Sequence, residues 1–203
     1  MVLISGSGSN LRALLEAADN PLNQIRILAV GADNPCEGLA HADLFGVPTF
    51  VVSPQNFASR EAWAAMLLDN INFFKPDLTV LAGFMRIVPA EFVRALTPNL
   101  INTHPSLLPE FPGSHAVRDA MAAGASHTGV TIHVVDEGVD TGPIITQSSL
   151  EIRADESEGE LHERIKVIER ALLVDVVKKI SRKEISLTEV AQRPANKDAH
   201  GSN

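Results

Sequence analysis

Short apolar runs alternate with amphipathic stretches along the first hundred residues of the chain. Between the runs, apolar residues recur at helical spacing, which predicts helices over residues 11–15, 38–45, 59–73 and 89–96. The runs themselves have the length and apolar character of strands buried in a sheet, and they cover residues 2–4, 25–30, 49–52, 78–82 and 99–101. Strands that alternate with helices in this way predict βαβ units and a parallel sheet.

The pattern changes after residue 109. A helix is predicted over residues 115–123, followed by two strands over 128–135 and 143–152 whose short connection makes them antiparallel neighbours. A long amphipathic helix over 158–180 comes next. The last residues, 191–203, form a polar tail that we expect to be disordered.

Together these elements predict one α/β domain over residues 1–190. The expected fold class is a doubly wound, mostly parallel, Rossmann-like sheet with helices on both faces and an antiparallel C-terminal strand pair. In sheets of this kind, ligands bind beyond the carboxyl ends of the strands. Polar residues that follow directly after a predicted strand are therefore the first candidates for a functional site.

Composition narrows the class of protein. A net charge of −8 argues against a general nucleic-acid binder, which needs a basic surface. No apolar run approaches the roughly 20 residues that span a bilayer, and the N-terminus lacks the basic region of a signal or transit peptide. The single cysteine, Cys36, allows no internal disulfide. We expect a cytoplasmic protein with no membrane or nucleic-acid partner.

A glycine-rich turn, SGSGSN at residues 5–10, joins the first strand to the first helix. A strand, a glycine-rich turn and a helix aim free backbone N–H groups at an anion, so Gly8, Ser9 and Asn10 are candidates for binding a phosphate. The dinucleotide fingerprint needs a third glycine where this chain has Leu11, although an acid, Asp33, does follow the second strand. A single phosphate is the favoured ligand, and a turn without any ligand is the simpler alternative.

The stretch NTHPSLLP at residues 102–109 follows the fifth predicted strand. Residues two apart in an extended chain point the same way, and Pro105 keeps His104 extended, so Asn102 and His104 face one side. An amide donor beside an imidazole suits a reaction in which a carbonyl oxygen gains negative charge and protons move near neutral pH. The alternative is that both side chains only cap a loop.

A second polar segment, DEGVDTGP at residues 136–143, lies between the two C-terminal strands. Asp140 within reach of His104 would raise the pKa of the imidazole and keep it protonated. The alternative is an acid solvated in a turn. His104, His115 and His133 stand too far apart in the sequence for a metal motif, so no metal site is predicted. Ser106 is disfavoured as a nucleophile because prolines flank it.

Five motifs carry a resemblance to a known family: residues 5–11, LAGFMRI at 81–87, NTHPSLLP, PGSH at 112–115, and VDTGP at 139–143. Their order and spacing resemble the phosphoribosylglycinamide formyltransferases, folate-dependent enzymes of purine synthesis. The resemblance runs from the first strand to about residue 180. This chain departs from the family pattern at Glu110, at Ser114, and at residues 31–35, where GADNP replaces a serine- and asparagine-containing strand end.

The resemblance implies roles for particular residues. The N-terminal half would bind the phosphate of 5-phosphoribosylglycinamide, and the C-terminal half would bind 10-formyltetrahydrofolate and carry out catalysis. Asn102, His104 and Asp140 would be catalytic. Phosphate or glycinamide contacts would come from Gly8, Ser9, Asn10, Lys166 and Glu169, and folate contacts from Arg60, Met85, Arg86, Ile87, Val88 and Asn102. The resemblance implies no metal, and it allows a homodimer.

Other functions remain open at this point. A formyltetrahydrofolate deformylase would use the same three side chains with water as acceptor, but those relatives carry an N-terminal regulatory domain and this chain starts at the first strand. A methionyl-tRNA formyltransferase would need a C-terminal RNA-contacting domain. A non-enzymatic regulator that binds a phosphate ligand would show binding without turnover.

Overall fold

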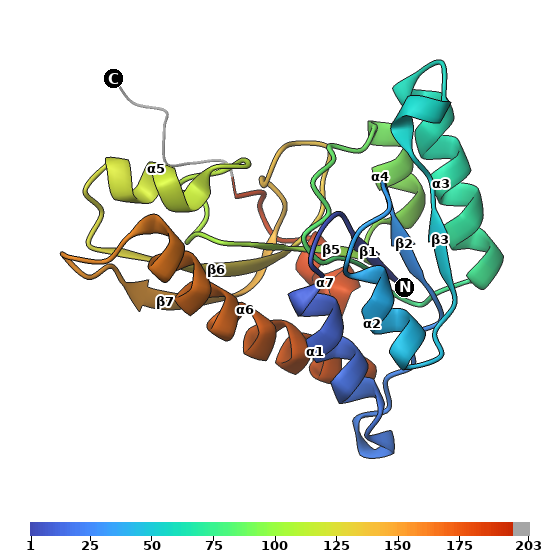
Figure 1. Cartoon of the computed structure of the whole chain (residues 1–203), viewed down its shortest axis with the longest axis horizontal. Helices are drawn as coiled ribbons and strands as arrows, with labels where there is room; N and C mark the ends of the chain where they lie inside the picture. The colour runs from blue at the N-terminus through green and yellow to red at the C-terminus, as the bar shows by residue number, and fades with distance from the viewer. Residues whose placement is uncertain (197–203) are drawn as a thin grey trace.

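One seven-stranded mixed sheet organises the protein in the computed structural model, which describes residues 1–196 (Figure 1). The strand order is β3-β2-β1-β4-β5-β6-β7, with parallel pairs from β3 to β5 and antiparallel pairs from β5 to β7. The strands are β1 (Val2–Ile4), β2 (Val30–Ala32), β3 (Thr49–Val51), β4 (Thr79–Leu81), β5 (Leu100–His104), β6 (His127–Val134) and β7 (Ile144–Glu151). The predicted fold class is confirmed.

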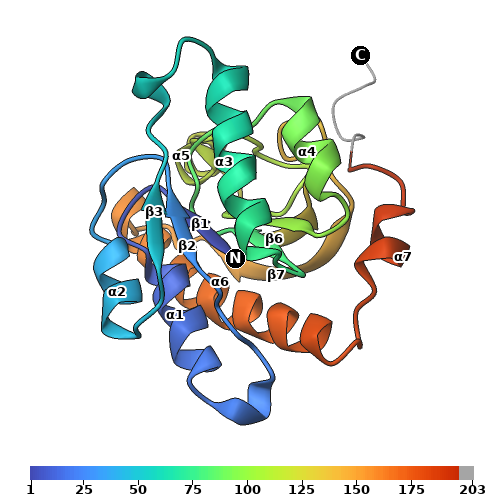
Figure 2. The ribbon, with the colours of Figure 1, turned by 90° about the vertical axis from the view of Figure 1, so that its right-hand side faces the viewer.

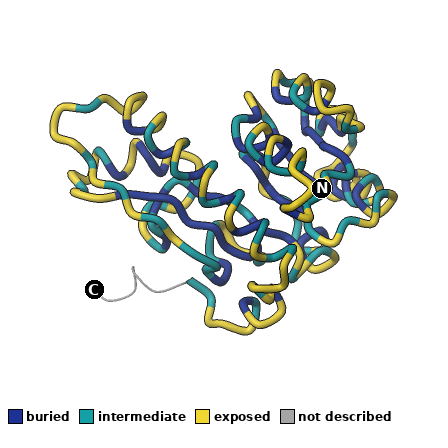
Figure 3. Tube along the Cα trace, turned by 90° about the horizontal axis from the view of Figure 1, so that it is seen from below, coloured by how far each residue is buried: buried dark blue, intermediate teal, exposed yellow. Residues whose placement is uncertain are grey.

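Alternation along the central strands builds two separate cores. Val2 and Ile4 pack into one core with residues of α1 and α6, whereas Leu3 between them packs into the other core with residues of α3 and α4. β5 repeats the pattern, with Ile101 in the first core and Leu100 in the second. Successive strand residues point to opposite faces, so a fully apolar strand needs helices on both sides. The central strands β1, β2 and β4 are buried at every residue, and Figure 3 shows buried residues along the inner part of the chain with exposed residues around them.

The helices begin where the sequence offers caps. The Ser59 side chain accepts a hydrogen bond from the Ala62 N–H at the start of α3, and Ser157 and Glu160 form a capping box at the start of α6.

No helix within residues 1–196 is both long and apolar enough to cross a membrane. The helices are α1 (Ser9–Ala18), α2 (Leu39–Leu44), α3 (Arg60–Phe74), α4 (Ala90–Leu96), α5 (Ala116–Ala122), α6 (Glu158–Ser181) and α7 (Leu187–Ala191), with short 3₁₀ turns at Pro21–Asn23 and Pro54–Asn56.

Two strand boundaries differ from the sequence prediction. β2 begins at Val30, not at residue 25, because the register pairs Val30 with Val2 and leaves no β1 residue opposite the preceding segment. β5 continues through His104, so Asn102 and His104 project from the strand itself rather than from the loop after it. Because both residues belong to the strand, the regular alternation of its side chains makes Asn102 and His104 point to the same face of the sheet.

The C-terminal segment also differs from the prediction. α7, which the sequence did not predict, buries Leu187 and Val190 near the end of α6 (Figure 2). Residues 191–196, expected to begin a disordered tail, contact the sheet: an Arg193 guanidinium N–H donates to the Ile144 carbonyl at 3.3 Å, and the Asn196 N–H donates to the Thr141 carbonyl at 2.7 Å. The rest of the predicted tail, 197–203, lies outside the described residues.

Candidate active site

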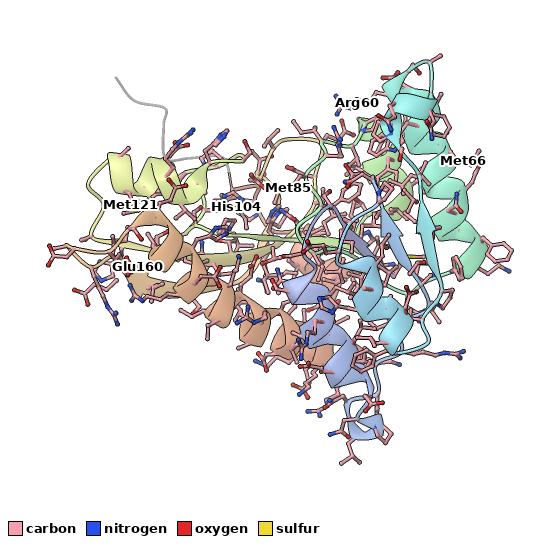
Figure 4. All side chains as sticks on the ribbon, viewed as in Figure 1. Arg60, Met66, Met85, His104, Met121 and Glu160 are labelled. Atoms are coloured by element: carbon pink, nitrogen blue, oxygen red, sulfur yellow. The ribbon has the colours of Figure 1, made fainter. Side chains whose placement is uncertain are left out.

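A cleft of about 520 Å³ opens at the carboxyl ends of β4 and β5. One wall is the irregular segment 83–88 after β4, and the other is the loop 136–140 between β6 and β7. Figure 4 shows Met85 and His104 near the middle of the molecule, between Arg60 on α3 and Met121 on α5. The position agrees with the general rule that doubly wound sheets bind ligands beyond the carboxyl ends of their strands.

The three residues predicted to be catalytic, Asn102, His104 and Asp140 (the trio), lie together in this cleft. The Asn102 amide N–H donates to Asp140 Oδ1 at 3.3 Å, and His104 Nδ1 lies 3.4 Å from Asp140 Oδ2. His104 is buried, and Asn102 and Asp140 are partly buried. The structure therefore brings the three side chains to one point, while their catalytic roles stay a prediction.

The backbone around Asp140 is arranged to present its carboxylate. Asp140 has φ of 54°, a left-handed conformation that a residue other than glycine adopts only when its surroundings hold it there. The Gly113 N–H donates to Asp140 Oδ2 at 2.8 Å, and the Thr141 hydroxyl donates to Asp136 Oδ1 at 2.7 Å, which ties the loop across its own turn. A Cβ at Gly142 would collide with the Val134 carbonyl, so only glycine lets the loop pass this close to β6.

His133 is a member of this cluster that the sequence reasoning missed. His133 Nδ1 lies 3.0 Å from the Val134 carbonyl, which places the proton of a neutral ring there and leaves Nε2 free to accept from the Asn102 amide at 3.2 Å. The antiparallel register pairs His133 directly with Asn102. His133 therefore orients the Asn102 amide, and only the β5–β6 register could have pointed to it.

Asp140 is ionised throughout the neutral range. Burial alone would raise the pKa of this carboxyl group. The His133 ring, whose Nε2 lies 3.6 Å from Asp140 Oδ1, the nearby His104 and the Gly113 N–H outweigh burial and lower the pKa to about 2. The cleft therefore holds a fixed negative charge beside the His104 ring.

The predicted protonation of His104 is not supported. Burial lowers the pKa of His104 below its usual value, and the opposing effects of Asp140 and the Phe111 carbonyl do not cancel it. The ring is therefore mostly neutral near pH 7. His104 Nε2 lies 2.9 Å from the Phe111 carbonyl, the shorter of its two contacts with oxygen, so the neutral ring carries its proton on Nε2 and turns the Nδ1 lone pair toward Asp140.

A titration followed by histidine NMR tests this assignment. We expect the His104 ring to titrate below the ordinary value of about 6.5 in the wild type. In the variant Asp140→Asn the value is expected to fall further, because the negative charge that favours the imidazolium is gone. A His104 pKa above 6.5, or one that rises in the variant, would contradict the assignment.

The glycine-rich turn has the geometry of an anion site. Gly8 is the N-cap of α1 with φ of 72°, and no side chain caps the first turn, so its backbone N–H groups are available. A Cβ at Gly8 would lie 2.7 Å from the Gly38 Cα, so the tight turn depends on glycine. Asn10 is only 6% exposed, and its Oδ1 has no hydrogen-bond partner, which is unusual for a buried amide.

Asp33 does not serve as the acid of a dinucleotide site. Its Oδ2 accepts a hydrogen bond from the Arg86 Nε at 2.6 Å, and its Oδ1 accepts from the Asn34 amide at 2.8 Å. Both carboxylate oxygens are therefore engaged within the protein. The contact explains why an acid after the second strand does not indicate a cofactor ribose here.

The remaining predicted residues divide into two groups. The folate residues Met85, Arg86, Ile87 and Val88 all line the cleft. Arg60, Lys166 and Glu169 do not line it: Arg60 is exposed at the first residue of α3, and Lys166 is paired with Glu163 at 2.8 Å. Glu169 is buried, and it accepts a hydrogen bond at 2.9 Å from the hydroxyl of Thr103, the β5 residue between Asn102 and His104 whose side chain points to the other face of the sheet. Within residues 1–196, no cluster of three or more His, Cys, Asp or Glu side chains is arranged to hold a metal ion.

Comparisons with known proteins identify the family of this chain. A family model described as formyl transferase matches residues 1–177. Phosphoribosylglycinamide formyltransferase of Mycobacterium tuberculosis strain H37Rv is 46% identical over 179 residues, which cover 87% of this chain and 82% of that protein. The Escherichia coli K12 protein of the same name is 38% identical over 173 residues, 85% of this chain and 82% of that protein. The crystal structure of glycinamide ribonucleotide transformylase 1 from Symbiobacterium toebii superposes with a TM-score of 0.88 at 34% identity, covering 91% of this chain and 88% of that one. The chain therefore belongs to the formyl transferase family.

Proposed function

We infer that this protein is a phosphoribosylglycinamide formyltransferase, which transfers the formyl group of 10-formyltetrahydrofolate to the amine of 5-phosphoribosylglycinamide in purine biosynthesis. The observation that carries the proposal is the meeting of Asn102, His104 and Asp140 in one cleft, in a chain whose relatives of that name cover most of its length. The three residues give the cleft the hydrogen-bond donors and the proton carrier that acyl transfer to an amine requires.

The folate donor suits the walls of the cleft. Met85 and Ile87 are 71% and 63% exposed at its mouth, and apolar side chains so exposed commonly mark a ligand site. A volume of about 520 Å³ is within the usual range for a small-molecule pocket. Met85, Arg86, Ile87 and Val88 are proposed to hold the pterin, largely through backbone groups, and Arg60 to meet the glutamate tail at the surface.

Asn102 and His104 are proposed to stabilise the negative charge that develops on the formyl oxygen. The formyl folate supplies the carbonyl carbon that the substrate amine attacks. The Asn102 amide keeps one N–H on His133 and turns the other from Asp140 Oδ1 to the formyl oxygen. The His104 Nε2–H is the second donor, and the formyl oxygen takes the place of the Phe111 carbonyl at Nε2. Donors fixed before the reaction need no reorganisation as the charge appears, which is why they accelerate it.

His104 is also proposed to carry the proton. As the new C–N bond forms, the attacking nitrogen becomes acidic and gives up a proton, and as the C–N10 bond breaks, the leaving nitrogen takes one up. A neutral ring with a free Nδ1 can accept the proton and then return it. Asp140 stabilises the imidazolium during that interval, because it stays negatively charged and lies 3.4 Å from Nδ1.

The second substrate is proposed to bind on the other side of the trio. Gly8, Ser9 and Asn10 would hold the ribosyl phosphate at the N-terminus of α1. Glu169, behind Thr103, would contact the glycinamide part, and Lys166 would join it after leaving Glu163. Among these contacts, the Asn10 amide N–H would donate to a phosphate oxygen, and its unpartnered Oδ1, which can only accept, would take a hydroxyl of the ribose.

The variant Asn10→Ala tests the phosphate subsite. We expect its KM for the ribonucleotide to rise about tenfold, because the hydrogen bond that the side-chain amide N–H donates to the charged phosphate is lost. The free energy of unfolding of the free protein should not fall, since the variant removes a buried acceptor that has no partner. Enzyme kinetics and thermal unfolding measure the two quantities. The matched control is Asn72→Ala, at the exposed far end of α3. An unchanged KM for the ribonucleotide would remove Asn10 from the site.

An absorbance assay for the folate product, run with and without the ribonucleotide, tests the function itself. We expect turnover only when both substrates are present. Folate turnover that ignores the ribonucleotide would identify a deformylase, and ligand binding with no turnover would identify a regulator. The homodimer and the cytoplasmic location expected from the sequence stay predictions.

A further inference from the structure

Segment 83–88, which forms one wall of the cleft, has no helix or strand of its own. Polar contacts from the neighbouring strand ends hold it instead. The Ser5 N–H donates to the Gly83 carbonyl at 3.1 Å, and the Met85 N–H donates to the Ser5 hydroxyl at 2.8 Å. The Arg86 Nε donates to Asp33 Oδ2 at 2.6 Å. The shape of this wall is therefore set by residues outside it.

Asp33 is the most deeply buried of these anchors. It directly follows β2, it is 2% exposed, and the Arg86 guanidinium supplies the positive charge that its carboxylate needs in that environment. The Asn34 amide donates both to Asp33 Oδ1 at 2.8 Å and to the Ser5 carbonyl at 3.2 Å, so it joins the two anchors to each other. A carboxylate fixed on both oxygens is a rigid attachment point.

The Asp33–Arg86 contact links the end of β2 to the segment that follows β4. Because the strand order is β2-β1-β4, the Asp33–Arg86 contact passes over the end of β1, where Ser5 begins the glycine-rich turn. Gly31–Pro35 is also the segment at which the sequence departs from the pattern of the family it resembles. At this strand end, Asp33 therefore pairs with Arg86 in the wall of the cleft and does not face the proposed phosphate site.

We propose that Asp33 is a positioning residue for the formyl-folate subsite, acting through Arg86 to fix the outer part of segment 83–88. It touches neither substrate. Its ion pair holds Arg86, and with it the backbone of Ile87 and Val88, in the place where the pterin would bind. The proposal rests on the function inferred above.

The test compares Asp33→Asn, Arg86→Gln and the double variant in the full-length enzyme. We expect each single variant to raise the KM for 10-formyltetrahydrofolate about tenfold, with kcat and the KM for the ribonucleotide changed less than about twofold. The double variant should be no worse than the poorer single one, because both changes break the same contact. The control is Glu156→Gln, which removes a partly buried carboxylate from its pair with Arg164 between β7 and α6, away from the cleft.

Each outcome decides the proposal. An unchanged folate KM in a folded Asp33→Asn enzyme overturns it, and so do additive effects in the double variant. The proposal is also overturned if Asp33→Asn impairs kcat, the folate KM and the ribonucleotide KM equally and Glu156→Gln does the same. That result would show a general loss of stability. If Asp33→Asn does not fold, Arg86→Gln alone decides, since that side chain is half exposed and its loss is tolerated more easily. A wild type without formyl transfer would refute the proposed function instead, which keeps the two failures distinct.

Discussion

Replacing His104 with alanine is expected to lower kcat by about 100- to 1000-fold, the usual effect of removing one donor to a developing oxyanion. Loss of the proton carrier can lower it further. Asn102→Ala is expected to have an effect of the same size, because the amide is the second donor. Steady-state kinetics with both substrates saturating measures kcat directly.

A control is needed because His104 is buried and its loss could disturb folding. His127→Ala changes an exposed histidine at the start of β6 and should leave kcat unchanged. Circular dichroism and thermal unfolding should show that His104→Ala keeps its fold. Near-normal turnover by a folded His104→Ala enzyme would contradict the proposed mechanism.

Asp140→Asn is expected to separate binding from catalysis. The variant keeps the size of the side chain and an oxygen that can accept from the Gly113 N–H, so both substrates should bind with little change. Turnover should fall at least about 100-fold, because the negative charge that stabilises the His104 imidazolium is gone. Titration calorimetry with each substrate, together with kcat, separates the two effects.

The matched control for this variant is Asp69→Asn, an exposed acid on α3. Loss of binding that parallels the loss of turnover would make Asp140 a substrate-binding residue. Unchanged turnover would remove it from the reaction altogether. Either result would leave the placement of Asp140 beside His104 in need of another explanation.

The alternation of strands and helices and the shared direction of Asn102 and His104 follow from local rules, which is why the sequence could predict the fold class and this pair. Apolar runs identify buried strands, and a period of two fixes which side chains share a face. The extent of β2 could not be predicted, because it depends on which β1 residue lies opposite. His133 was missed for the same reason, since its partnership with Asn102 is a matter of register between β5 and β6.

The protonation of His104 was predicted wrongly because the sequence names the neighbours of a group but not its burial. A nearby carboxylate does raise the pKa of an imidazole, and here it does so, yet removal from water has the larger and opposite effect. Asp33 is a comparable case. Its place after the second strand matched one part of a dinucleotide fingerprint that the sequence otherwise did not favour, and only the path of segment 83–88 reveals that Asp33 pairs with Arg86.

Strand β5 presents polar side chains on both of its faces. In β5, Asn102 and His104 face the cleft, whereas Thr103 turns to the opposite side and holds Glu169 on α6. Insertion or deletion of one residue ahead of Asn102 would exchange the two faces, which would take Asn102 and His104 out of the cleft and Thr103 away from Glu169. Leu100 and Ile101 pack into different cores, and a shift by one residue would bring each of them to the wrong face of the sheet. Attempts to graft this chemistry onto another scaffold would need to transplant those two hydrophobic residues along with the polar ones.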